Sequence, residues 1–98
     1  MVVLEPMTEE QFQGFLERSI ARRAGKWVER GIWSEAKALD ACRELYTKRL
    51  PQGRSTLHHH FLNIRERDGG ARVGEAWYVA EELGGRLQFW VEWLWIDP

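Results

Sequence analysis

The stretch that decides the fold is Phe89-Trp90-Val91-Glu92-Trp93-Leu94-Trp95-Ile96. Apolar side chains occupy both alternating sets of positions in it, and only Glu92 interrupts them. A strand written this way is typical of a central strand that is covered on both faces. Asp97 and Pro98 follow, and the sequence stops there. We therefore expect that a further segment or another chain covers this strand.

The composition favours one small soluble-type domain, which we place at residues 1–98. Hydrophobic residues make up 44% and charged residues 30%, which is ordinary for a globular chain. Six tryptophans are many for so small an interior, so some of them are expected at a groove or an interface.

Several classes of protein are disfavoured by the charge pattern and the cysteine content. A net charge of −1 with interspersed acids and bases argues against a nucleic-acid partner. Cys42 is the single cysteine, which excludes an internal disulfide and a cysteine-based zinc site. The sequence holds no apolar run of membrane-spanning length and no secretory leader pattern, so we expect no membrane association and a cytoplasmic location.

The order of elements read from the periodicity is β-α-α-β-β-β, an α+β arrangement that ends in an antiparallel meander. Thr8 and Gln11 form a capping box that opens the first helix, and Ser34 caps the second. Two glycine pairs, Gly69-Gly70 and Gly84-Gly85, mark hairpin turns. The expected elements are a strand at 2–4, helices at 8–31 and 34–50, and strands at 57–65, 72–80 and 86–96.

This arrangement resembles the N-terminal half of the GNAT superfamily of N-acetyltransferases. The short first strand runs into Glu5-Pro6-Met7-Thr8, two helices follow, and three hairpin-connected strands complete the order. Arg72-Val73-Gly74-Glu75-Ala76-Trp77 is similar to the family's third strand, and Leu94-Trp95-Ile96-Asp97-Pro98 to the end of its fourth. The resemblance extends over essentially the whole chain and implies a GNAT-like fold.

The chain also departs from the family's pattern. In the family, a Gly-rich loop after the fourth strand opens a helix and holds the pyrophosphate of coenzyme A. The two glycine pairs of this sequence lie in hairpin turns that open no helix, so we expect the coenzyme A loop and the C-terminal lobe to be lacking. We therefore expect no cofactor for the chain alone, and acetyl-CoA if a missing segment or a partner completes it.

The resemblance also implies site residues on the fourth strand. The backbone of Leu94, Trp95 and Ile96 would face the pantetheine arm and the acetyl group. Glu92 is the only acid within the strand, so it is the candidate general base. The competing interpretation of Glu92 is a salt-bridged carboxylate at the rim of the cleft.

The run His58-His59-His60 suggests a metal site at first sight, but on a strand only His58 and His60 share a face. A zinc site needs at least three protein ligands, so no metal is expected. By resemblance, His59, His60 and Trp77 would border the acceptor cleft, while the alternative is an ordinary hydrogen-bonded strand end.

Three functional interpretations remain open. The first is a truncated acetyltransferase-like domain that is not competent alone and associates through its aromatic strand, as a homodimer or with a complementing chain. Its interface residues would be Phe89, Trp90, Trp93 and Trp95. The second is the N-terminal part of an active acetyl-CoA-dependent N-acetyltransferase. The third is a small-ligand module with an aromatic cleft.

Overall fold

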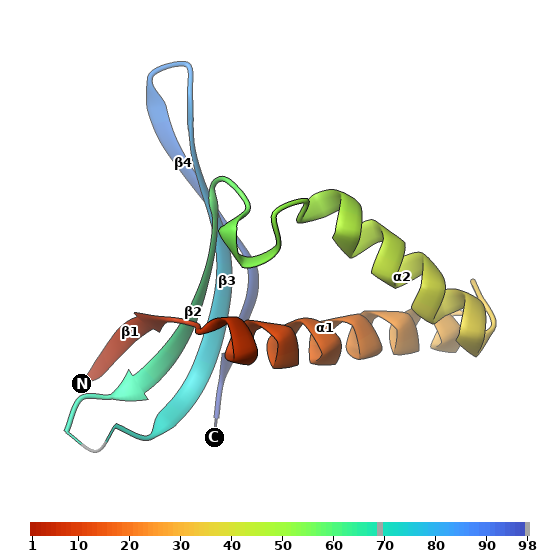
Figure 1. Ribbon diagram of the computed structural model, residues 1–98, viewed down its shortest axis with the longest axis horizontal. Coiled ribbons are helices and arrows are strands. Elements are labelled where there is room, and N and C mark those ends of the chain that lie inside the picture. The colour runs from red at the N-terminus through yellow and green to blue at the C-terminus, as the bar shows by residue number, and fades with distance from the viewer. Residues whose placement is uncertain (69, 98) are drawn as a thin grey trace. The chain divides into compact units, whose positions relative to one another are not determined.

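The computed structural model describes residues 1–68 and 70–97, and it has the predicted order of elements (Figure 1). The helices and strands are β1 (Val2–Pro6), α1 (Glu9–Glu29), α2 (Glu35–Arg49), the short 3-10 helix η1 (Gly53–Ser55), β2 (His59–Glu66), β3 (Arg72–Leu83) and β4 (Arg86–Ile96). The chain divides into two compact units, which are described separately: residues 1–8 with 54–98 form a sheet unit, and residues 9–53 form a helical unit. The α+β prediction is confirmed.

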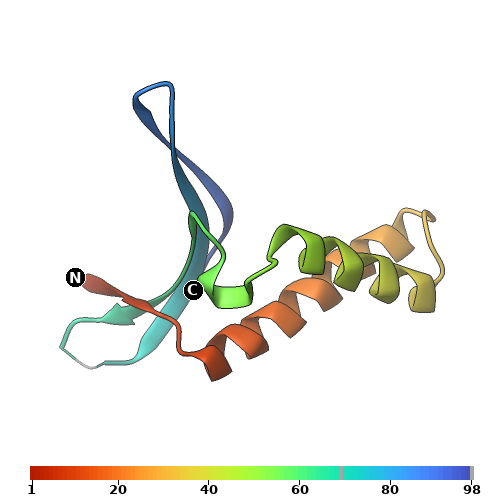
Figure 2. The ribbon, with the colours of Figure 1, turned by 45° about the horizontal axis from the view of Figure 1, so that its top comes forward.

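The sheet unit is a four-stranded antiparallel sheet in the order β1-β2-β3-β4. β3 and β4 form its long hairpin, which twists along its length in Figure 2. Leu83 pairs with Arg86 across Gly84 and Gly85, whose φ angles are 60° and 79°. Two successive residues with positive φ suit a two-residue hairpin turn. Because the turn contains only these two glycines, β3 continues to Leu83, three residues beyond the predicted end at Ala80. Gly69, in the other predicted turn, lies outside the described residues.

The sheet has its buried residues on its inner strands, β2 and β3. Phe61 and Asn63 of β2 and Trp77 and Val79 of β3 are all nearly inaccessible. Phe61 pairs directly with Trp77, and their rings lie 5.4 Å apart. This buried pair belongs to the main core of the sheet unit, where aromatic area contributes most.

In the described residues the aromatic strand has a neighbour on one side only, and the expectation that a further segment or another chain covers it stays a prediction. β4 pairs with β3 alone and lies at the edge of the sheet. Phe89, Val91 and Ile96 are each at least 60% exposed. A run that is apolar at both alternating sets of positions indicates that a strand would tolerate cover on both faces, but it does not indicate which strand it pairs with.

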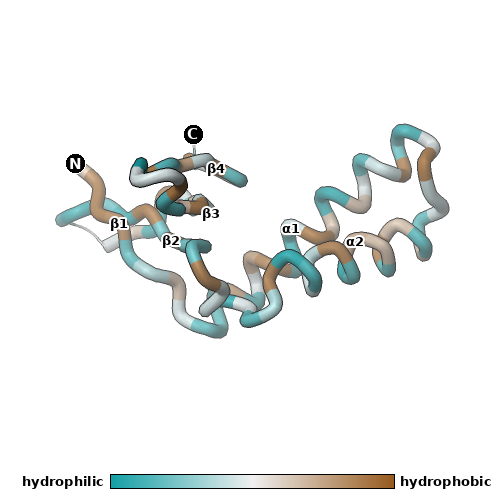
Figure 3. The backbone as a smooth tube through the Cα atoms, turned by 90° about the horizontal axis from the view of Figure 1, so that it is seen from above, coloured by the Kyte–Doolittle hydropathy of each residue, from teal (hydrophilic) through white to brown (hydrophobic). Residues whose placement is uncertain are grey.

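The helical unit is an antiparallel pair of helices that pack through one apolar stripe each. α1 buries Phe12, Phe15, Ile20 and Ala24, and its stripe repeats as the brown segments along the tube in Figure 3. The buried residues of α2 are Ala38, Cys42 and Tyr46. Both helices were predicted from the sequence. Cys42 is fully buried, and burial raises the pKa of its thiol above the ordinary range against the opposing effect of Arg23 and Arg43.

Gly74 fixes how closely β3 and β4 approach each other. A Cβ atom at this position would collide with the carbonyl oxygen of Trp95 and lie 3.2 Å from the Cα of Ile96. We expect Gly74→Ala to lower the free energy of unfolding by about 1–3 kcal/mol, because backbone atoms must shift. Gly25→Ala in α1 is the matched control, since a Cβ there meets nothing within 4 Å.

The measurement for this pair is urea denaturation of both variants, followed by circular dichroism. The helical control should be neutral or more stable by up to about 1 kcal/mol. An unchanged stability for Gly74→Ala would contradict the close approach of the two strands.

Candidate functional site at the bulged edge strand

The register between β3 and β4 contains a bulge at Glu92. Trp77 pairs with Trp93, and the next residue, Tyr78, pairs with Val91, so Glu92 is the extra residue on β4. Directly paired residues share a face, so Val91 and Trp93 lie on opposite faces although they are two apart. The alternation used in the sequence analysis therefore fails across Glu92. Bulges of this kind re-aim one side chain and often stand beside active sites.

The bulge also determines which main-chain groups of β4 face outward. Asp97 donates its backbone N–H to the carbonyl of Val73 at 2.7 Å, so this pair is a hydrogen-bonded one. Hydrogen-bonded and non-bonded pairs alternate along an antiparallel ladder. Trp95 therefore points its N–H and C=O toward β3, while Leu94 and Ile96 point theirs away from it. The backbone of Leu94, Trp95 and Ile96 was expected to face a cofactor. Of these three residues, Leu94 and Ile96 have their N–H and C=O groups at the outer edge of β4.

His59 and Trp77 form one polar contact on the buried face. The indole N–H of Trp77 donates to Nδ1 of His59 at 2.9 Å, and the two rings lie 5.8 Å apart. A ring nitrogen that accepts carries no proton, so neutral His59 holds its proton on Nε2. This contact fixes the tautomer and the orientation of the imidazole.

His60 lies on the opposite face from His59, because it pairs with Tyr78 and His59 pairs with Val79. Its ring stacks on Tyr78 with 4.7 Å between centroids, and Tyr78 in turn lies 6.1 Å from Phe89. The structure thus joins His59 with Trp77 and separates His60 from both. The residues expected to line one cleft belong to two surfaces of the sheet.

The four candidate interface residues differ in exposure. Phe89 is 62% exposed, Trp95 is 47% exposed, Trp90 is 39% exposed and Trp93 is half-buried. The rings of Trp93 and Trp95 are nearly parallel at 6.4 Å, and the indole N–H of Trp95 donates to Asp97 at 2.8 Å. The aromatic strand is therefore a surface feature in the described part of the chain.

Two residues of this region escaped the sequence analysis. Tyr78 joins His60 to Phe89, and the signal was its position opposite the histidine run in a hairpin. Glu75 is a nearly buried carboxylate that pairs with Arg72 at 3.5 Å. The burial of this carboxylate can be predicted only when the strand register is known, because the neighbouring residues in sequence do not indicate how deeply the strand is buried.

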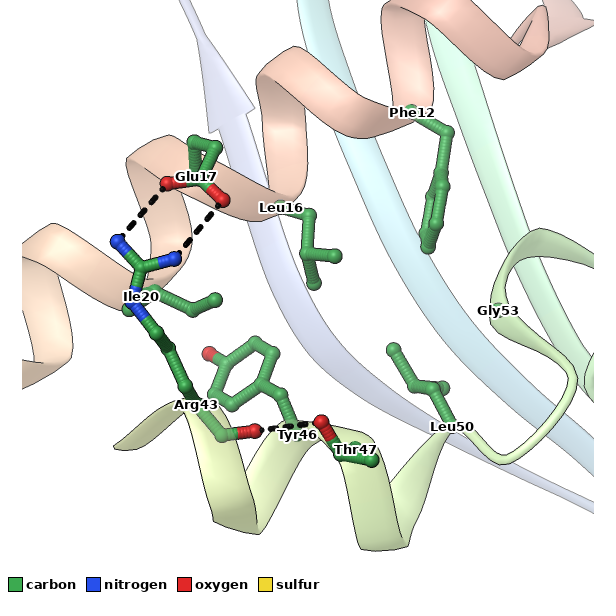
Figure 4. A pocket seen from close by; sticks show the side chains of 9 residues that line it. All are labelled: Phe12, Leu16, Glu17, Ile20, Arg43, Tyr46, Thr47, Leu50 and Gly53. Atoms are coloured by element: carbon green, nitrogen blue, oxygen red, sulfur yellow. Dashed lines mark hydrogen bonds and ion pairs between the residues drawn. The ribbon is translucent and has the colours of Figure 1, made fainter. Parts of the chain in front are cut away.

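The helical unit contains a separate open pocket of about 270 Å³ (Figure 4). The guanidinium of Arg43 bridges both carboxylate oxygens of Glu17 at 3.4 Å on one rim. The ring of Tyr46 forms part of the wall, and burial raises the pKa of its hydroxyl against the opposing effect of Arg23. None of the site residues predicted from the sequence lines this pocket.

Metal and membrane sites receive no support from the described residues. Over residues 1–68 and 70–97, no three side chains of the usual metal-ligating types come together. No helix in this part of the chain combines the length and the apolar character needed to cross a membrane.

A sequential antiparallel sheet with two helices after its first strand, and a bulged fourth strand, defines the class as an acetyltransferase-type half-fold. Two curated relatives come from Bacillus subtilis (strain 168). The uncharacterised N-acetyltransferase YdgE is 36% identical over 80 residues, which cover 82% of this chain and 50% of YdgE. The uncharacterised N-acetyltransferase YycN is 33% identical over 82 residues, which cover 82% of this chain and 51% of YycN.

The crystal structure of the Bacillus subtilis protein YycN superimposes with a TM-score of 0.72 and 29% identity, covering 84% of this chain and 52% of YycN. No protein-family model matches the chain. The chain spans about half the length of the curated relatives it matches. It is thus similar, in sequence and in fold, to the N-terminal half of GNAT-type N-acetyltransferases, and the resemblance identified from the sequence is confirmed.

Proposed function

We propose that this chain forms the N-terminal half of an acetyl-CoA-dependent N-acetyltransferase and that acetyl transfer requires further residues. The observation that carries the proposal is the outer edge of β4, where Leu94 and Ile96 present main-chain groups directly after a bulge. The similarity to half of two N-acetyltransferases supports the same reading.

The edge suits an extended ligand that carries amide groups. An extended chain laid along a strand edge exchanges main-chain hydrogen bonds with it, as an added strand does. The pantetheine arm of acetyl-CoA has such amides, so Leu94 and Ile96 would hold it in register. Side-chain identity then matters less at these two positions than backbone direction.

We propose that Glu92 accepts the proton of the acceptor amine. In the transfer, the amine nitrogen forms a bond to the acetyl carbonyl carbon, and the bond from that carbon to the thioester sulfur breaks. The amine gives up one proton to a base, and the coenzyme A thiolate takes one. Glu92 is the acid of β4 and stands at the bulge, next to the outward main chain. We assign it the role of general base.

Main-chain contacts alone bind the coenzyme weakly, because most of its charge lies in the pyrophosphate. That group needs several convergent N–H donors, as a helix N-terminus with a glycine loop provides. Gly84 and Gly85 lie in the β3–β4 turn and Gly70 in the turn before β3, and none of the three opens a helix. The chain by itself is therefore expected to transfer no acetyl group.

The test is a fusion that supplies the remaining part of the fold. Residues 1–97 are joined to the portion of YdgE that lies outside the matched region, and release of coenzyme A is followed with a panel of amines. We expect release from the fusion and none from the 98-residue chain. Turnover by the chain alone would overturn the proposal, and so would a folded fusion that fails to bind acetyl-CoA.

A further inference from the structure

The outward main-chain groups of β4 change parity at the bulge. Ala80 donates its backbone N–H to the carbonyl of His58, just before β2, and the carbonyl of Val73 accepts from Asp97, just after β4. Even-numbered residues of β3 therefore face β2, and odd-numbered ones face β4. The β4 residues that pair with odd positions therefore point inward. The residues left pointing outward are Leu87, Phe89 and Val91 before Glu92, and Leu94 and Ile96 after it.

This change of parity makes the edge complementary to itself. In an antiparallel pair related by a two-fold axis, the first half of the strand meets the second half of its copy. Leu87 then stands opposite Ile96 of the second copy, and Phe89 opposite Leu94. Each pair joins two outward-pointing residues, as hydrogen-bonded pairs require. A regular strand would oppose outward and inward residues in this register, so the bulge is what permits it.

The side chains match in the same register. Leu87, Phe89, Leu94 and Ile96 are each at least 55% exposed and apolar. All four pair with even-numbered residues of β3, so they share one face and would cover one another across the axis.

The charges at the two ends of β4 match as well. Arg86 would stand opposite Asp97 of the second copy, and the two-fold axis repeats this opposite-charge pair. Trp90 would lie opposite Trp93 of the second copy, on the face of the sheet that does not carry Leu87 and Ile96. Only the two copies of Glu92 approach each other with like charge, near the axis.

We propose that the 98-residue chain forms a homodimer through antiparallel pairing of β4 with β4 of a second copy, in the register that opposes Arg86 and Asp97. The two sheets become one continuous sheet, which removes an exposed, apolar edge. This proposal does not depend on acetyl transfer, although the same edge serves both. A segment that completes the acetyltransferase fold at β4 would displace the second copy.

The first experiment measures mass by sedimentation equilibrium. The chain should sediment at twice its 11.6 kDa mass at high protein concentration. Leu94→Pro removes an N–H group that points away from β3, so the hydrogen bonds between β3 and β4 remain intact. The variant loses a hydrogen bond to the second copy and should be a monomer. Leu94→Ala keeps the N–H and should stay dimeric with weaker affinity. A monomeric wild-type chain, or a dimeric proline variant, would overturn the proposal.

The second experiment fixes the register and does not depend on proline tolerance. Arg86→Asp and Asp97→Arg should each raise the dimer dissociation constant about tenfold, because each brings like charges together twice. The double variant restores the opposite charges and should recover the wild-type constant. Lys48→Glu on α2 is the charge-reversal control, and it should leave the dimer dissociation constant unchanged. Losses that add in the double variant would refute this register.

Mass and coenzyme A release report on the two proposals separately. A dimer together with an inactive fusion would support the pairing and contradict the acetyltransferase assignment. A monomer together with an active fusion would do the reverse.

Discussion

Glu92→Gln in the fusion of residues 1–97 with the remaining part of YdgE is expected to lower kcat by about 10²–10⁴-fold. The amide cannot accept the proton of the acceptor amine, while its shape preserves the bulge between Val91 and Trp93. Acetyl-CoA should bind the variant with an unchanged dissociation constant, because the main-chain groups of Leu94 and Ile96 remain in place.

The pH profile separates a proton-transfer role from a structural one. The wild-type fusion should lose kcat/KM as the pH falls and the base becomes protonated, and the glutamine variant should lose this acidic limb. Glu82→Gln, on the exposed end of β3, is the control and should keep both the rate and the limb. A glutamine variant that retains the rate would remove Glu92 from the mechanism.

Trp77→Ala is expected to lower the free energy of unfolding by about 3–5 kcal/mol. Trp77 is 3% exposed, its ring lies 5.4 Å from Phe61, and its indole N–H donates to His59. Truncation removes the transfer free energy of the indole and leaves a cavity between β2 and β3. Few single substitutions in this chain should cost as much.

Trp95→Ala provides the matched control, since it removes the same side chain from a position that is 47% exposed. Its stack on Trp93 and its bond to Asp97 are surface interactions, and their loss should cost about 1 kcal/mol. Guanidinium denaturation of both variants makes the comparison. Equal losses would contradict the buried position of Trp77.

The sequence predicted the elements that depend on local chemistry. Gly84 and Gly85 dictate a tight hairpin, and the apolar stripe from Phe12 to Ala24 dictates a helix that buries one face. These signals lie within a few residues of the structure they cause, so the order of the whole chain could be read from them. The acetyltransferase resemblance followed from that order.

The candidate site was less accessible to prediction because it depends on register. The position of β4 at the edge, the extra residue at Glu92 and the separation of His59 from His60 all follow from which residues pair across strands. A run such as the one around Trp93 is equally apolar in several registers. Alternation therefore assigned the faces correctly only up to the bulge.

The extra residue in β4 also affects how distant relatives should be aligned with this chain. The side chains on one face of β4 stand at odd positions up to Val91 and at even positions from Leu94 onward. A relative with an unbulged strand would match both halves only if a single gap stands at Glu92. A gap placed elsewhere would align residues of one face of the strand with residues of the opposite face. The residues before Glu92 and those after it should therefore be compared with relatives as two separate blocks.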